Sequence, residues 1–144
     1  RAFFAQRQPG SAIKPLIYAA ALEQGATASS LWDDTPVSYN RGDGKTWTPK
    51  NYRGEVLGEL TLREALAHSN NVITVKLLDA IGVADFVAFA RNLGLPLRTP
   101  NDLSLALGTD EVTLHDLTLA YTPLATGGRL PASRKPAGAK LSPR

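Results

Sequence analysis

The stretch that decides the fold is RQPGSAIKPLIYAAALE, which spans residues 7–23. Its apolar residues recur at helical spacing from Leu16 to Ala21, so the pattern predicts a helix over residues 11–24. Pro15 has no amide hydrogen and is tolerated only near the start of a helix. Ser11 is therefore expected in or just before the first turn, where backbone N–H groups have no partner within the helix.

Immediately before Pro15 the chain reads Ser11-Ala12-Ile13-Lys14, which matches the pattern S-x-x-K. Residues three apart share one face of a helix, so the lysine amine is expected to reach the serine hydroxyl. A serine becomes an effective nucleophile when a base takes its proton. A lysine acts as that base only when burial or a nearby cation lowers its pKa. The alternative is a plain structural role, in which Ser11 caps the helix.

A polar triplet interrupts the other strongly apolar part of the sequence. Thr61 and Glu64 form a capping-box pattern, which predicts the start of a helix, and apolar periodicity then continues as far as Gly82. The triplet Ser69-Asn70-Asn71 breaks that periodicity. It matches S-x-N, whose hydroxyl and amide suit a cleft wall and a proton relay. The alternative is a polar kink in a helix, and Ser38-Tyr39-Asn40 matches the same three-letter pattern.

The rest of the chain predicts one hairpin and two more helices. Residues 36–48 alternate around a turn signal at residues 41–44, which is typical of a β-hairpin. An irregular loop is expected to follow over residues 47–52. One further helix is expected over residues 84–92. The last begins at Thr113 and ends at Gly127-Gly128, and its internal Pro123 is expected to kink or shorten it.

Composition restricts the classes of function. The 144 residues suit one domain, and the longest apolar run, residues 16–22, is far shorter than the about 20 residues of a membrane helix. Cysteine is absent and neither histidine lies in a metal-ligand pattern, so no metal and no cofactor is expected. The net charge is +3, and residues 129–144 hold five basic and no acidic residues, which leaves −2 on residues 1–128. That basic tail is expected to be irregular and solvated rather than bound to nucleic acid.

The segment of residues 7–23 resembles the nucleophile segment of class A penicillin-binding proteins, whose wider superfamily carries S-x-x-K, a serine–asparagine motif and K-T-G. Further stretches match the family in order: Asp34-Thr35-Pro36, WTPKNY at residues 47–52, TLREALAHSNN at residues 61–71, LALGTDEVT at residues 105–113, and residues 120–128. The resemblance covers about residues 3–129. It implies the α+β fold of β-lactamases and transpeptidases, of which this chain holds mainly the helical part and a short β-hairpin. Residues 1–128 are interpreted as a partial transpeptidase domain, and residues 129–144 as a basic, irregular or frame-shifted tail.

By this resemblance the chain is a fragment of a penicillin-binding transpeptidase of peptidoglycan synthesis that works through an acyl-enzyme. The resemblance implies that Ser11 attacks a D-Ala–D-Ala carbonyl and that Lys14 is its base. It also implies that Ser69 passes the proton to the leaving amine and that Asn71 holds a substrate amide. The implied partners are peptidoglycan stem peptides and β-lactam antibiotics. The implied location is the bacterial cell envelope, at the outer face of the cytoplasmic membrane, with the anchor outside this chain.

The sequence also departs from the family. K-T-G is absent, and residues 129–136 stand where its sheet strand is expected. That strand supplies an oxyanion-hole donor in the family, and losing one such donor typically costs about 100- to 1000-fold in rate. We therefore expect impaired transpeptidation, and we expect exposed apolar helix faces where the sheet would pack. Two alternatives stay open: a β-lactamase or D,D-carboxypeptidase of the same superfamily, and a noncatalytic helical interaction module.

Overall fold

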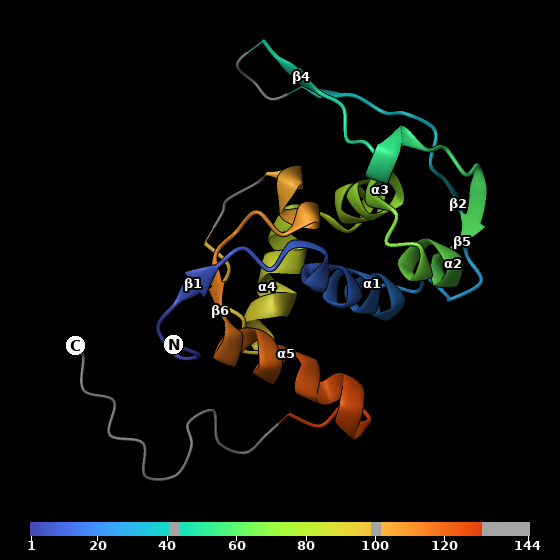
Figure 1. Cartoon of the computed structure of the whole chain (residues 1–144). Coiled ribbons are helices and arrows are strands. Elements are labelled where there is room, and N and C mark those ends of the chain that lie inside the picture. The colour runs from blue at the N-terminus through green and yellow to red at the C-terminus, as the bar shows by residue number, and fades with distance from the viewer. Residues whose placement is uncertain (41–43, 99–101, 131–144) are drawn as a thin grey trace, which may run out of the picture.

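The fold is described by a computed structural model that covers residues 1–40, 44–98 and 102–130. Helices form the body of the molecule, and short strands lie at its edges (Figure 1). The predicted turn at residues 41–44 lies mostly outside the described residues, and so does the tail from residue 131 onward.

The described residues form five α-helices and three short 3₁₀ helices. The α-helices are α1 (Lys14–Glu23), α2 (Leu62–Ala67), α3 (Asn71–Ile81), α4 (Val83–Asn92) and α5 (Leu114–Thr126). The 3₁₀ helices are η1 (Gly10–Ile13), η2 (Tyr52–Gly54) and η3 (Leu103–Leu107). All the predicted helices are therefore present, and α4 begins one residue before its predicted start.

The predicted helix over residues 11–24 divides into η1 and α1, and Pro15 explains the division. An α-helical bond to the Ser11 carbonyl would come from the N–H of residue 15, which proline lacks. The N–H of Lys14 bonds to the Ser11 carbonyl instead, and this shorter spacing is that of a 3₁₀ turn. The nucleophile candidate thus lies on a tight turn at the head of α1.

The strands form three antiparallel pairs of two or three residues each. β3 (Tyr39–Asn40) pairs with β4 (Thr46–Trp47), which confirms the predicted hairpin. β1 (Gln6–Arg7) pairs with β6 (Val112–Thr113), and β2 (Leu31–Asp33) pairs with β5 (Glu59–Thr61). The sequence did not predict these two pairs because each joins segments that are distant in the chain. Figure 1 shows the hairpin extending away from the helices.

The polar triplet at residues 69–71 lies at the break between α2 and α3: Ser69 and Asn70 fall between the two helices, and Asn71 is the first residue of α3. The capping box of α2 is confirmed: Thr61 Oγ1 accepts from the Glu64 N–H, and the Glu64 carboxylate accepts from the Thr61 N–H. The chain then turns at Ser69, whose φ of 52° lies in the left-handed region. Asn70 caps α3 by accepting from the N–H of Ile73 at 2.9 Å. The interruption is therefore a true break between two helices.

The last helix, α5, passes through the proline that was expected to disturb it. Thr113 caps α5 by accepting from the Asp116 N–H at 3.0 Å, as predicted. Pro123 was expected to kink or shorten the helix, and it does not shorten it, because α5 continues to Thr126. Gly127, with a φ of 67°, ends it as predicted. A proline removes only one helical N–H, and the turn beyond it keeps its own hydrogen bonds.

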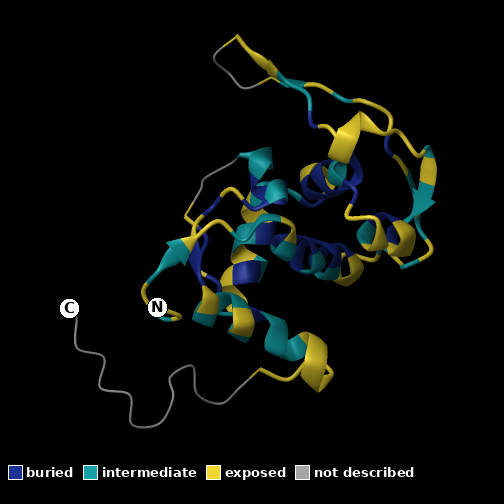
Figure 2. Cartoon of the chain, viewed as in Figure 1, coloured by how far each residue is buried: buried dark blue, intermediate teal, exposed yellow. Residues whose placement is uncertain are grey.

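The core surrounds α1, which is apolar on nearly all sides. Ile13, Leu16 and Ile17 are fully buried, together with Leu78 of α3 and Phe86 of α4. Figure 2 shows the buried residues gathered on α1, α3 and α4, whereas α5 is intermediate or exposed along most of its length. Only Ala120 of α5 is buried, and its Leu114 and Leu124 are more than half exposed. Apolar side chains of α5 are therefore exposed.

Two distant segments hold the η1 turn in place. The Gly10 N–H donates to the Gly108 carbonyl at 3.3 Å, and the Tyr121 hydroxyl donates to the Ala12 carbonyl at 2.5 Å. The backbones approach so closely that a Cβ on Gly108 would lie 2.2 Å from the Gly10 carbonyl oxygen. Glycine is therefore required at position 108 both for its φ of 71° and for the contact.

We expect Gly108→Ala to destabilise the protein more than Gly127→Ala, which serves as its control. Both residues have similar positive φ values, but a Cβ at position 127 meets no atom within 4 Å. The left-handed backbone costs either alanine variant about 1–2 kcal/mol, and overpacking adds about 1–3 kcal/mol at Gly108 alone. Urea unfolding of both variants measures the difference. Equal free energies of unfolding would show that the Gly10–Gly108 contact is not tight.

Candidate active site

The Ser11 side chain is exposed and points to the α2–α3 break. Its hydroxyl oxygen accepts a hydrogen bond from the Ser69 hydroxyl at 3.1 Å. Neither η1 nor α1 has a side-chain cap, and their N-cap residues are Pro9 and Ile13. The alternative that Ser11 is a helix cap was therefore wrong.

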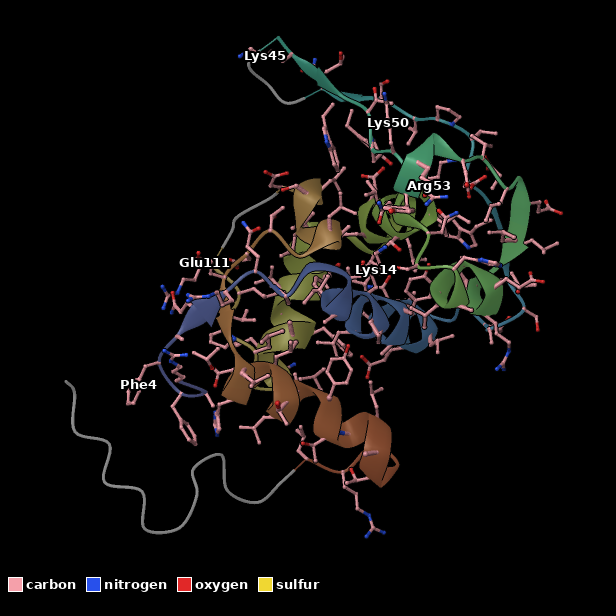
Figure 3. All side chains as sticks on the ribbon, in the orientation of Figure 1. Phe4, Lys14, Lys45, Lys50, Arg53 and Glu111 are labelled. Carbon is pink, nitrogen blue, oxygen red and sulfur yellow. The ribbon has the colours of Figure 1, made fainter. Side chains whose placement is uncertain are left out.

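Lys14 is buried at the first turn of α1, with 1% of its surface exposed (Figure 3). Its amine donates to three acceptors of the α2–α3 break. These are the Ser69 carbonyl at 2.6 Å, the Ser69 hydroxyl at 3.0 Å and Asn71 Oδ1 at 2.6 Å. An ammonium group has three donors, so each is matched by one acceptor.

Burial has a chemical consequence for this amine. It lowers the pKa of Lys14 from the usual 10.5 to about 8, because the charged form loses its hydration. At pH 7 about a tenth of the side chains are then neutral, as a base must be to accept a proton. The sequence predicted direct contact between Lys14 and Ser11. The amine instead donates all its hydrogen bonds to residues 69 and 71, and Ser69 forms the link to Ser11.

Hydrogen bonds hold both polar atoms of the Asn71 side-chain amide. Its Nδ2 donates to the Lys50 carbonyl at 2.9 Å, while its Oδ1 accepts from Lys14. The loop of residues 47–52 therefore lies against the polar triplet. The competing S-x-N match lies elsewhere, on the hairpin, where the Ser38 and Thr48 hydroxyls share a hydrogen bond at 2.6 Å. The structure thus brings together all four residues singled out from the sequence: Ser11, Lys14, Ser69 and Asn71.

A buried polar cluster behind the triplet was missed by the sequence interpretation. Asp34 is fully buried, and its carboxylate accepts from the side-chain amides of Asn51 and Asn70, each at 2.8 Å. Asn51 Oδ1 accepts in turn from the backbone N–H groups of Asn71 and Val72. Asp34 and Asn51 stood within stretches that resemble the family, but nothing local in the sequence indicates that they meet.

The residues that the structure describes contain no cluster of histidine, cysteine and carboxylate side chains suited to a metal ion. Within the same part of the chain, no helix combines the length and apolar character needed to cross a membrane.

Comparison with known proteins identifies the family. The family model "Penicillin binding protein transpeptidase domain" matches residues 1–130. Penicillin-binding protein 1A of Neisseria gonorrhoeae is 44% identical over 131 residues, which make up 89% of this chain and 16% of that protein. This chain therefore spans 16% of the length of that relative.

Solved structures confirm the predicted α+β fold. Penicillin-binding protein 1A from Haemophilus influenzae superposes with a TM-score of 0.79 at 35% identity, over 85% of this chain and 19% of that one. Penicillin-binding protein A from M. tuberculosis, solved as an imipenem acyl-enzyme complex, gives a TM-score of 0.75 at 26% identity, over 89% and 34% of the two chains. The sequence match and the shared fold agree, and this chain belongs to the penicillin-binding protein transpeptidase domain family, as a fragment of the class A type.

Proposed function

We propose that this chain carries the acylation site of a penicillin-sensitive transpeptidase of peptidoglycan synthesis, with Ser11 as the nucleophile. The observation that supports this most is the continuous hydrogen-bonded path from Ser11 through Ser69 to the buried amine of Lys14. Such a path lets a weakly nucleophilic hydroxyl lose its proton as it attacks a carbonyl.

In the acylation step, Ser11 Oγ forms a bond to the carbonyl carbon of the terminal D-Ala–D-Ala peptide bond. When the Lys14 amine is neutral and accepts, the two hydroxyls turn so that Ser11 donates to Ser69 Oγ and Ser69 donates to the amine, the reverse of the hydrogen bonds in the structure. The Ser11 proton then moves to Ser69 Oγ, and the Ser69 proton moves to the neutral amine of Lys14. The protonated amine then returns a proton through Ser69 to the leaving nitrogen, and D-Ala departs. A stem-peptide amine from a neighbouring strand next attacks the ester, which frees Ser11 and completes the crosslink.

Asn71 is proposed to bind the substrate. Its Oδ1 accepts from Lys14 and has a second lone pair, which suits an N–H of the stem peptide. The Lys50 carbonyl fixes the orientation of the amide, so this oxygen stays turned toward the site. A β-lactam would acylate Ser11 in the same way, and its nitrogen would stay attached after the ring opens.

The partners proposed for the site are peptidoglycan stem peptides and β-lactam antibiotics, with no cofactor and no nucleic acid. The proposed location is the bacterial cell envelope, at the outer face of the cytoplasmic membrane, where that substrate is found. Since the sequence holds no K-T-G, one oxyanion donor of the family is not supplied by these residues. We expect acylation in this chain to be slower by about 100- to 1000-fold than in a complete site.

The first test is covalent labelling by a fluorescent penicillin. We expect wild-type protein to gain the mass of one opened penicillin on the peptide that contains Ser11, and Ser11→Ala to gain none. Ser38→Ala is the matched control, because it changes the serine of the competing motif and should label like wild type. No labelling of the wild type, or equal labelling of Ser11→Ala, would contradict the proposal. Fast turnover of a chromogenic cephalosporin in place of a stable adduct would favour a β-lactamase.

The second test is the pH dependence of labelling. Because the base must be neutral and the pKa of Lys14 is about 8, we expect the labelling rate to rise about tenfold per pH unit below pH 8 and to level off above it. Spontaneous opening of the penicillin is measured without protein and subtracted. Lys14→Arg should remove the labelling, since a guanidinium stays protonated. A rate independent of pH between 6 and 9 would exclude Lys14 as the base.

A further inference from the structure

One buried charged group takes no part in the chemistry proposed above. Asp34 follows β2 directly and is fully buried. The backbone N–H of Leu57 donates to both of its carboxylate oxygens at 3.0 Å, and the N–H of Gly58 donates to Oδ1 at 2.8 Å. The Asp34 Oδ2 also accepts from the Nδ2 groups of Asn51 and Asn70. A buried charge is retained only when it is compensated in this way.

The carboxylate sets the direction of both amides. An ionised carboxylate only accepts hydrogen bonds, so Asn51 and Asn70 must each turn Nδ2 toward Asp34 and Oδ1 away from it. The Asn70 Oδ1 then accepts from the Ile73 N–H. The Asn51 Oδ1 accepts from the N–H groups of Asn71 and Val72, at 2.8 and 3.1 Å. Three N–H groups of the first turn of α3 thus receive their partners through one acid.

The charge state of the acid agrees with this arrangement. Burial alone would raise the pKa of Asp34, but the N–H groups that bond to it outweigh burial and hold its pKa below the usual 3.8. The acid is therefore ionised at neutral pH and keeps both amides in one orientation.

The segment that these amides hold is strained. Ser69 has a left-handed φ of 52°, which is unfavourable for a residue with a Cβ atom. Its carbonyl and hydroxyl nevertheless both accept from Lys14. Such a conformation persists where its neighbours are fixed. Here Asn70 is bonded directly to Asp34, and Asn71 is linked to Asp34 through Asn51.

Building on the function proposed above, we propose that Asp34 is a positioning residue of the acylation site. Through the side-chain amides of Asn51 and Asn70, it fixes Ser69 and Asn71 against the amine of Lys14. In this role Asp34 contacts neither the nucleophile nor the substrate.

The test begins with Asp34→Asn. The new amide has a similar shape, but an NH2 donor group replaces one carboxylate oxygen. That group faces other donors in either orientation: the two asparagine amides, or the N–H groups of Leu57 and Gly58. Asp33→Asn is the matched control, because it makes the same substitution one residue away on an exposed side chain that pairs with Lys76. Both variants are compared with wild type at equal folded fraction, set from urea unfolding curves.

Two readouts are measured. We expect Asp34→Asn to speed hydrogen exchange at the Asn71 and Val72 amides at least tenfold, relative to amides at the centre of α3. We also expect it to slow penicillin labelling at least tenfold. Asp33→Asn should change neither by more than about twofold. The exchange readout does not require that the site be active, so it separates this proposal from the proposed function.

A second variant tests whether the effects of Asp34→Asn come from general damage to the fold. In Asp34→Asn combined with Asn51→Asp, the new amide can donate to the new carboxylate, which still accepts from the N–H groups of Asn71 and Val72. We expect this exchange of groups to restore part of the amide protection and part of the labelling rate.

Each outcome either supports or overturns the positioning role of Asp34. Faster exchange in Asp34→Asn with recovery in the double variant supports the proposal, even if wild type is not labelled and the proposed function fails. A wild type that labels, with exchange and labelling in Asp34→Asn equal to those of Asp33→Asn, overturns the positioning role alone. If neither Asp34 variant folds while Asp33→Asn folds, Asp34 is needed for the stability of the whole fold, and the proposal is also overturned.

Discussion

The structure depends on one constraint, the need of a buried lysine amine for hydrogen-bond acceptors. Lys14 lies on the central helix, and a buried ammonium without partners is strongly unfavourable. All three of its acceptors come from Ser69, in the break between α2 and α3, and from Asn71, the first residue of α3. The break must therefore lie against the head of α1, and this contact brings the Ser69 hydroxyl to Ser11. The same contact that keeps the lysine buried thus assembles the site.

The polar interior is organised between two buried charges of opposite sign. Hydrogen bonds lead from the Lys14 amine to the Asn71 side chain, and from the Asn71 backbone N–H through Asn51 to the carboxylate of Asp34. Every donor along this route points toward the acid. Hydrogen bonds that share one direction polarise and strengthen one another in a medium of low polarity. This explains how a short segment with a left-handed serine stays fixed.

Much of the local structure was predictable from the sequence, because its causes are local. The capping box at Thr61 and Glu64 and the break at residues 69–71 each follow from neighbouring residues. The division between η1 and α1 also has a local cause in Pro15, although one continuous helix was predicted there. The two long-range strand pairs and the role of Asp34 were not predictable, since they join segments that no periodicity connects. Spacing also predicted that Lys14 would contact Ser11 directly, whereas its amine donates to Ser69 and Asn71, and Ser69 lies on the path to Ser11.

The Lys14 amine is buried and bonded at the break, where it can be neutral near physiological pH. Its titration is measured directly by carbon-13 NMR of lysine Cε, with the Lys14 signal assigned by its loss in Lys14→Arg. We predict a midpoint near pH 8, well below the usual 10.5 of a lysine side chain. A midpoint near 10.5 would mean that the amine is solvated, and it would contradict both the geometry of the break and the role of Lys14 as the base.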